Sequence, residues 1–143
     1  MSGVAVIRWL LVNDAAITAI VPAARVIAGL LPINTVLPAI EVTQISGVPS
    51  NFIKTNEKPK VHTDRVQVSV LFKGPEGTPA GAGYPGVKSL LALVLKACPS
   101  QRGLINGVLV DSIQPDTVGP DISDAVAAIY SQTRDFRVIW VEP

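Results

Sequence analysis

The chain has very few of the side chains on which catalysis, metal binding and disulfide formation usually depend. Its 143 residues include one histidine, His62, and one cysteine, Cys98. A single histidine excludes two-histidine metal sites and the HExxH zinc motif, and a histidine base also needs a positioned partner. A single cysteine excludes an intramolecular disulfide and hence a disulfide-built secreted scaffold. We interpret His62 as a surface histidine and Cys98 as a small buried hydrophobe.

Charged residues and long apolar runs are also scarce. Only 16% of the residues are charged and the formal net charge is +1, so no general attraction to nucleic acid or an anionic membrane is expected. The apolar opening Val4–Val21 is interrupted by Arg8 and by Asn13 and Asp14, and no uninterrupted stretch of about 18 apolar residues occurs. We therefore expect a soluble, unprocessed protein with no membrane partner.

Hydrophobic side chains, in contrast, make up 48% of the sequence. This content is enough for a packed core, and the length favours a single domain over residues 1–143. Because polar surface is limited, we also expect part of the apolar surface to be covered by other subunits.

Three segments have the composition of β-strands and bracket one amphipathic helix. They are Leu37–Ser46, Thr63–Lys73 and Ser131–Glu142. The middle segment alternates strictly, which is typical of a half-exposed antiparallel strand; its apolar residues are Val66, Val68, Val70 and Phe72. Arg25–Ala28 is a candidate edge strand, and a further strand is predicted at Ile105–Ile113. Gln114–Asp124 is expected to be a polar, turn-rich connection.

Two helices are predicted from apolar residues at helical spacing, besides a short one that Asn13 or Asp14 can cap and that Pro22 ends. One covers Val4–Val12, and the other carries its apolar stripe from Val87 to Leu95 and ends before Pro99. The fold class is therefore α+β, with a mostly antiparallel four- to five-stranded sheet. The helices, one N-terminal and one mid-chain, should pack on one face of that sheet.

The segment Gly47–His62 contains three proline and glycine breakers and has no convincing period. We predict a long loop or an extended hairpin arm there. Loops longer than about 12–15 residues are uncommon in compact domains and are usually functional or mobile. This segment is therefore the first candidate for a contact surface.

The remaining motifs yield no catalytic, cofactor-binding or metal-binding residues. The glycines of Gly74–Gly86 match the letters of a dinucleotide-binding motif, but Pro85 interrupts the turn and no P-loop ending is present. Four aspartates follow one another without an intervening basic residue, but their spacing is not that of a calcium loop. These are Asp111, Asp116, Asp121 and Asp124.

The placement of charge is more informative than its amount. The basic residues Lys54, Lys58, Lys60 and Arg65 are concentrated in and beside the Gly47–His62 segment, whereas the four aspartates make a later segment acidic. In a ring of identical subunits, each interface joins two different surfaces, so a basic patch can meet an acidic patch of the next subunit. These eight residues are candidate contacts between subunits or with a partner. The alternative, two ordinary solvated segments, remains open.

Taken in order, the segments resemble the tail-completion, or tail-terminator, proteins of long-tailed bacteriophages and related prophages. The similarity lies in the helical opening with Leu10-Leu11 and Asp14-Ala-Ala-Ile, the strands LPAIEVTQIS and TDRVQVSVLFK, the single mid-chain helix, and the closing TRDFRVIW. It covers essentially the whole chain. These motifs are hydrophobic strand patterns rather than invariant chemical residues.

The resemblance implies a structural virion protein rather than an enzyme, with no cofactor. Such a protein forms a homo-hexameric ring that caps the head-proximal end of the tail tube, stops its polymerisation and joins the tail to the head-completion (neck) proteins. Its implied partners are itself, the tail tube protein and a neck protein, without sequence-specific nucleic acid, although the genome passes through such rings. It is implied to assemble in the host cytoplasm and to reside in the tail or neck. The alternatives are another neck or head–tail joining protein, or a small ligand-binding regulatory domain.

Overall fold

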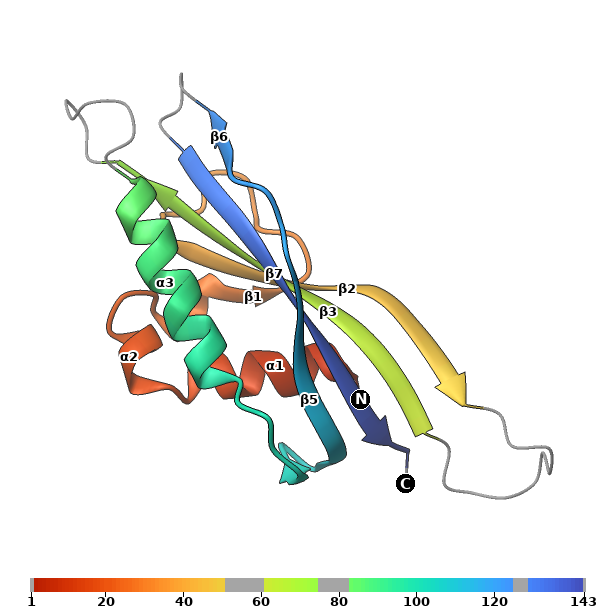
Figure 1. The fold of residues 1–143 in the computed structure, drawn as a ribbon. Helices are drawn as coiled ribbons and strands as arrows, with labels where there is room; N and C mark the ends of the chain where they lie inside the picture. Colours follow the sequence, from red (N-terminus) through yellow and green to blue (C-terminus); the bar gives the residue numbers. More distant parts are fainter. Residues whose placement is uncertain (1, 51–60, 75–82, 125–128, 143) are drawn as a thin grey trace.

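The computed structural model describes residues 2–50, 61–74, 83–124 and 129–142. The helical elements are α1 (Gly3–Val12), α2 (Ala15–Thr18), a 3-10 turn η1 (Ala23–Arg25) and α3 (Tyr84–Ala97). The strands are β1 (Val26–Ala28), β2 (Ala39–Ser50), β3 (Val61–Lys73), β4 (Gly103–Ile105), β5 (Val108–Val118), β6 (Ile122–Asp124) and β7 (Ile129–Val141). The α+β class is confirmed, with the helices against one side of a long sheet (Figure 1).

The described strands form one sheet of seven, in the order β1-β2-β3-β7-β5-β4, with β6 also paired to β7. Among the described strands, β1 and β2 are the one parallel pair. A mostly antiparallel sheet is therefore confirmed, but the predicted four to five strands are too few. Three strands have only three residues each. Of these, β1 was predicted at Arg25–Ala28, whereas β4 and β6 account for the difference.

The segment from Gly103 to Val118 departs most from the prediction. Asn106 and Gly107 have φ angles of 50° and 76°, and they form a two-residue turn that pairs β4 with β5. An Asn-Gly pair is the preferred sequence for such a hairpin because both residues tolerate positive φ. The predicted strand Ile105–Ile113 is thus two strands. The predicted turn at Gln114–Asp124 is mostly strand as well, because β5 continues to Val118 and β6 follows.

The Gly47–His62 segment is a hairpin arm rather than a loop over its described part. Pairing between β2 and β3 continues through Pro49 and His62 to Ser50 and Val61. Residues 51–60 lie outside the described part of the chain. The described residues at each end are therefore paired strand residues.

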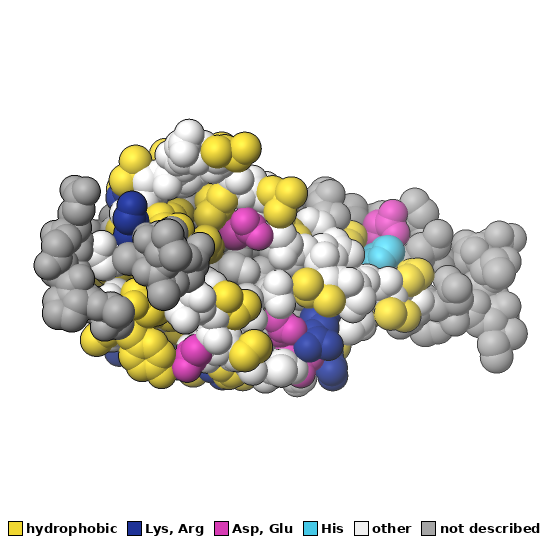
Figure 2. Space-filling model, turned by 90° about the horizontal axis from the view of Figure 1, so that it is seen from above, with side chains coloured by type: hydrophobic (Ala, Val, Ile, Leu, Met, Phe, Trp, Pro, Cys, Tyr) yellow, Lys and Arg dark blue, Asp and Glu magenta, His cyan; other side chains and the backbone are white. Residues whose placement is uncertain are grey.

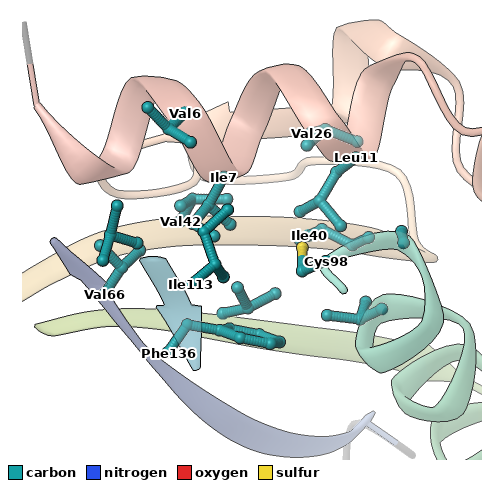
Figure 3. Close-up of a cluster of buried hydrophobic side chains, with 14 of the residues drawn as sticks. Val6, Ile7, Leu11, Val26, Ile40, Val42, Val66, Cys98, Ile113 and Phe136 are labelled. Carbon is teal, nitrogen blue, oxygen red and sulfur yellow. The ribbon is translucent and has the colours of Figure 1, made fainter. Parts of the chain in front are cut away.

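The helices cover the face of the sheet formed by the apolar residues of β3. Val66, Val68 and Val70 are fully buried. In Figure 3, Ile7 and Leu11 of α1 are directed toward this sheet. Further buried residues come from α3 and from the central strands: Leu90, Val94, Ile40, Val42, Ile113, Phe136 and Val138. None of the described helices lies on the second face of the sheet, which is named the helix-free face.

Local sequence explains where the helices begin and end. The Ser2 hydroxyl accepts a hydrogen bond from the Ala5 amide, and the Asp14 carboxylate accepts one from the Ile17 amide. Such side chains satisfy amides that have no partner within the helix. Helix α3 has Pro85 in its first turn and ends before Pro99, which disfavours helical conformation in the preceding residue.

Cys98 follows α3 and is buried in the core, as predicted. Burial raises the pKa of its thiol to about 12, because removing the thiolate from water is costly. This thiol is neutral at physiological pH and has the role of a small hydrophobe.

Candidate assembly surface

The helix-free face carries a network of charged and polar side chains centred on Arg65. The guanidinium donates from Nε to Asp135 Oδ2 at 2.8 Å and from Nη2 to Thr117 Oγ1 at 3.1 Å. Gln67 donates from Nε2 to the other oxygen of Asp135 at 3.3 Å. Asp135 is only 5% exposed, so its charge is compensated by Arg65 rather than by water.

Asp116 joins the same network from β5. Its Oδ2 lies 3.8 Å from Arg65 Nε and 3.5 Å from Arg137 Nη2. Two arginines and two aspartates therefore neutralise one another on this face. Of the candidate contact residues whose side chains the structure describes, Arg65 and Asp116 are brought together, within a single chain.

The other acidic candidates lie apart from this network. Asp111 accepts from Arg102 at 2.8 Å in an exposed pair. Asp124 belongs to β6, but its side chain is not described, and Lys54, Lys58 and Lys60 lie outside the described residues. The proposed meeting of basic and acidic segments between subunits stays a prediction.

Asp121 is linked to α3 through Lys88. Lys88 Nζ donates to Asp121 Oδ1 at 2.7 Å and to Gln132 Oε1 at 2.8 Å, and the Tyr84 hydroxyl donates to Asp121 Oδ2 at 3.1 Å. The hydrogen bond between Lys88 and Asp121 lowers the pKa of the Asp121 carboxyl and raises the pKa of the Lys88 amine. Both groups are open to solvent, which limits the contribution of this pair to stability.

A buried carboxylate that the sequence prediction did not identify lies at the base of the hairpin arm. Asp64 is 4% exposed, and its Oδ2 accepts from the Gly3 amide and from Trp140 Nε1, both at 2.8 Å. One oxygen thus joins the start of α1, β3 and β7. The signal was present in the sequence, since Asp64 precedes Val66 by two residues and so shares the buried side of the alternation.

His62 is partly exposed at the surface, as predicted, and contacts the same tryptophan as Asp64. Its imidazole stacks on the indole of Trp140, with centroids 4.4 Å apart and planes inclined by 14°. Its Nε2 is 3.0 Å from Glu142 Oε2. The pairing of β3 with β7 places His62 opposite Trp140, which accounts for this stacking.

Exposed hydrophobic residues gather at several places rather than in one pocket. Leu30, Ile33 and Val36 in the segment between β1 and β2 are 83%, 93% and 66% exposed. Next to them is an open groove of about 520 Å³, lined in part by Leu31, Leu71 and Ile129. Figure 2 shows separate yellow patches and adjacent basic and acidic side chains, with no extended field of one charge.

Two further apolar sites lie along the outer strands of the sheet. Ile45 and Val48 of β2 are 50% and 62% exposed. Leu104 and Leu109 face each other across β4 and β5 and are 76% and 47% exposed. Exposed apolar residues on outer strands are typical of surfaces that pair with another chain.

The described residues offer neither a cluster of metal ligands nor a membrane-spanning helix. No group of three or more potential metal-ligating side chains occurs in this part of the chain. None of its helices has the length and apolar character needed to cross a bilayer.

Comparison with known proteins identifies the fold. No model of a protein family matches the sequence, and no curated protein matches it. A chain in the solved virion of a native gene transfer agent (GTA) particle is similar, with a TM-score of 0.66. The chain shares its fold with that virion protein. The similarity covers 99% of this chain and 96% of the GTA chain at 13% identity, a level at which the fold is what the two have in common.

Proposed function

We propose that the protein is a structural component of a phage-like virion, and within it the tail terminator. It forms a ring, most simply a hexamer, at the head-proximal end of the tail tube, stops tube growth and presents a surface to the neck proteins. The observation that carries this proposal is the shared fold with a chain of the GTA virion over nearly the full length of both chains. The order of strand motifs in the sequence, which resembles tail terminators, supports the specific role.

The surface fits a role in assembly rather than catalysis. The central charges of the helix-free face neutralise one another within the chain. They belong to Arg65, Asp116, Asp135 and Arg137. His62 is engaged with Trp140 and Glu142 instead of facing a cleft. Exposed apolar residues are spread over the outer strands and the segment before β2, as expected for a subunit with several neighbours.

The test is to locate the protein in particles produced by the phage or prophage that carries its gene. Purified tails should end in a ring that contains this chain, and deletion of the gene should give tails of uncontrolled length that do not join heads. Negative-stain microscopy and mass spectrometry of separated tails and heads measure both. Absence of the chain from mature tails and virions would overturn the proposal. Its presence on tail-less heads would instead identify a neck protein.

A further inference from the structure

Much of the outer edge of β2 has no strand beside it in the described part of the chain. Strand β1 pairs only with Ile40, Glu41 and Val42. From Gln44 to Pro49 the residues are exposed. An edge of this kind presents unpaired backbone N–H and C=O groups and is a ready site for another strand.

The direction of the backbone groups on β2 follows from a single hydrogen bond. The Gly29 amide donates to the Val42 carbonyl at 2.9 Å, so the polar groups of Val42 point outward, away from β3. The backbone N–H and C=O groups of successive strand residues point to opposite edges of the strand. The groups of Val68, the partner of Val42 on β3, therefore point toward β7, and so do the groups of Asp64, four residues away. Gly47, which is paired with Asp64, therefore has its own N–H and C=O directed outward.

Among the described residues, much of the outer edge of β5 also has no strand beside it. Strand β4 pairs only with Val108, Leu109 and Val110. The same alternation, carried from β3 through β7, directs the backbone groups of Ile113 and Pro115 away from β7. Described residues from Gln114 to Val118 are exposed.

The prolines on these strands agree with this assignment. Pro49 lies opposite His62 and Pro115 opposite Phe136, and in both cases the alternation points the proline nitrogen outward. A proline lacks the N–H that an inner ladder requires, so it is tolerated where its nitrogen faces outward from an edge strand. These prolines also restrict pairing at each edge to a short stretch, which limits association with unrelated strands.

The open edges of β2 and β5 lie level with each other across the sheet, and their strand directions allow antiparallel pairing. Gly47, Asp64, Val138 and Ile113 are successive partners in one row across the sheet. The four long strands β2, β3, β7 and β5 alternate in direction, so β5 is antiparallel to β2. A second copy placed beside the first at the same height would therefore continue the antiparallel pattern.

We infer that β5 of one subunit pairs with β2 of the next copy of this chain, with Ile113 opposite Gly47. This contact rests on the proposed ring and specifies how its subunits join. It uses different surfaces on the two subunits, as a ring requires. Gly47 and Ile113 exchange two backbone hydrogen bonds, and the Pro115 carbonyl accepts from the amide of Gln44, which lies in the row of Pro115.

A disulfide trap tests this register. In this register Ser46 faces Gln114. Ser46 precedes Gly47 by one residue and Gln114 follows Ile113 by one residue, and these positions lie opposite each other in antiparallel strands. Such a non-hydrogen-bonded pair places the Cα atoms about 4.5 Å apart, within the range a disulfide spans. Within one chain the same residues are separated by β3 and β7, about 14 Å at the usual strand spacing. Native Cys98 is buried and does not compete.

The double variant Ser46→Cys, Gln114→Cys should give, under mild oxidation, a ladder of covalent oligomers that ends at the ring size and collapses on reduction. The matched control is Ser46→Cys with Lys96→Cys, since Lys96 is exposed on α3 away from both edges. Light scattering before oxidation and thermal unfolding verify that each variant assembles and folds.

The outcomes separate this inference from the proposed function. Rings that form without the Ser46–Gln114 ladder, or with an equal ladder in the control, overturn the edge pairing while the terminator role stands. A ladder from a protein that is absent from tails supports the pairing and overturns the role. A variant and wild type that remain monomeric at every concentration, alone or with tail tube, overturn both.

Discussion

Asp64 connects parts of the chain that are far apart in sequence. Its Oδ2 accepts from the Gly3 amide in α1 and from the Trp140 indole in β7. A carboxylate at the first turn of a helix also interacts favourably with the helix dipole. Gly3 is required at this contact, because a Cβ there would lie 2.9 Å from the Cβ of Asp64.

We expect Asp64→Ala to lower the free energy of unfolding by about 2–4 kcal/mol, because it leaves two buried donors without an acceptor. Asp64→Asn should cost less, since its amide oxygen still accepts both hydrogen bonds. Urea unfolding followed by tryptophan fluorescence measures the difference. Asp111→Ala removes an exposed carboxylate and serves as the control. Equal stability of Asp64→Ala and this control would show that the buried contact contributes nothing.

Cys98 gives a second prediction at this scale, and it concerns pH. Because the pKa of the folded thiol is raised to about 12, the unfolded chain loses this proton first as pH rises. Above pH ~9 the free energy of unfolding should therefore fall, at up to about 1.4 kcal/mol per pH unit from this group. Other groups titrate in the same range, so the relevant quantity is the difference between the wild type and Cys98→Ala. Parallel stability profiles for the two proteins from pH 8 to 11 would contradict the prediction.

Among the elements, β3 and α3 show how the apolar alternation is converted into a core. The buried side of β3 is confirmed for Val66, Val68 and Val70, whereas Phe72 at the end of the series is only partly buried. Its aromatic ring lies against the first turn of α3, where a Cβ on Gly86 would come within 2.8 Å of it. Packing at this end therefore depends on a small residue in the helix.

Replacing Leu91 or Phe72 by Ala should destabilise the protein by about 2–4 kcal/mol, with the smaller loss at Phe72 because less of its surface is buried. Leu95→Ala on the same helix is the control, since Leu95 is 37% exposed and surface changes usually stay within about 0.5 kcal/mol. Thermal unfolding compares the three. An unchanged midpoint for both Leu91→Ala and Phe72→Ala would mean that the helix packs on the sheet through another face.

The long elements were predictable from local pattern because their periodicity is strong over ten or more residues. Strand β3, helix α1 and helix α3 were placed close to their observed bounds for this reason. The strands of three residues are too short to show a clear period; β1 was nevertheless predicted at Arg25–Ala28, whereas β4 and β6 were not. The β4–β5 hairpin is an exception, because the Asn106-Gly107 pair was a readable signal.

The contact residues were less predictable than the fold. The local concentration of basic and acidic residues predicted that Arg65 and Asp116 contact different subunits. Strand pairing instead brings them together in one chain. Asp135, the closest partner of Arg65, is 70 residues away in sequence. No local pattern specifies such a partner, because it depends on the register between β3 and β7.

For the whole molecule, the basic segment gives a prediction about assembly. We expect Lys58→Glu with Lys60→Glu to weaken ring formation, most strongly at low salt, because exposed charges are least screened there. Light scattering at two ionic strengths measures the effect. Reversing Asp111 to Lys in the same protein should restore part of it. Asp111 is suited to this test because its own partner, Arg102, forms an exposed pair of small energetic value.

Asp116 is a poorer choice for such a reversal, because it neutralises Arg65 and Arg137 in its own subunit. If the lysine reversals leave the mass of the ring and the length of tails unchanged at both ionic strengths, the basic segment takes no part in assembly. Changes at high salt alone would contradict an electrostatic origin.

The contact at Asp64 also has a practical consequence for imaging the assembled particle. Because one oxygen holds both Gly3 and Trp140, the two described ends of the chain come together near the base of the arm (Figure 1). Epitope tags fused at either terminus should therefore be decorated by antibodies at the same height along a tail. Two independently tagged proteins would then give the same marker position, and that position would show which way the arm points in the particle.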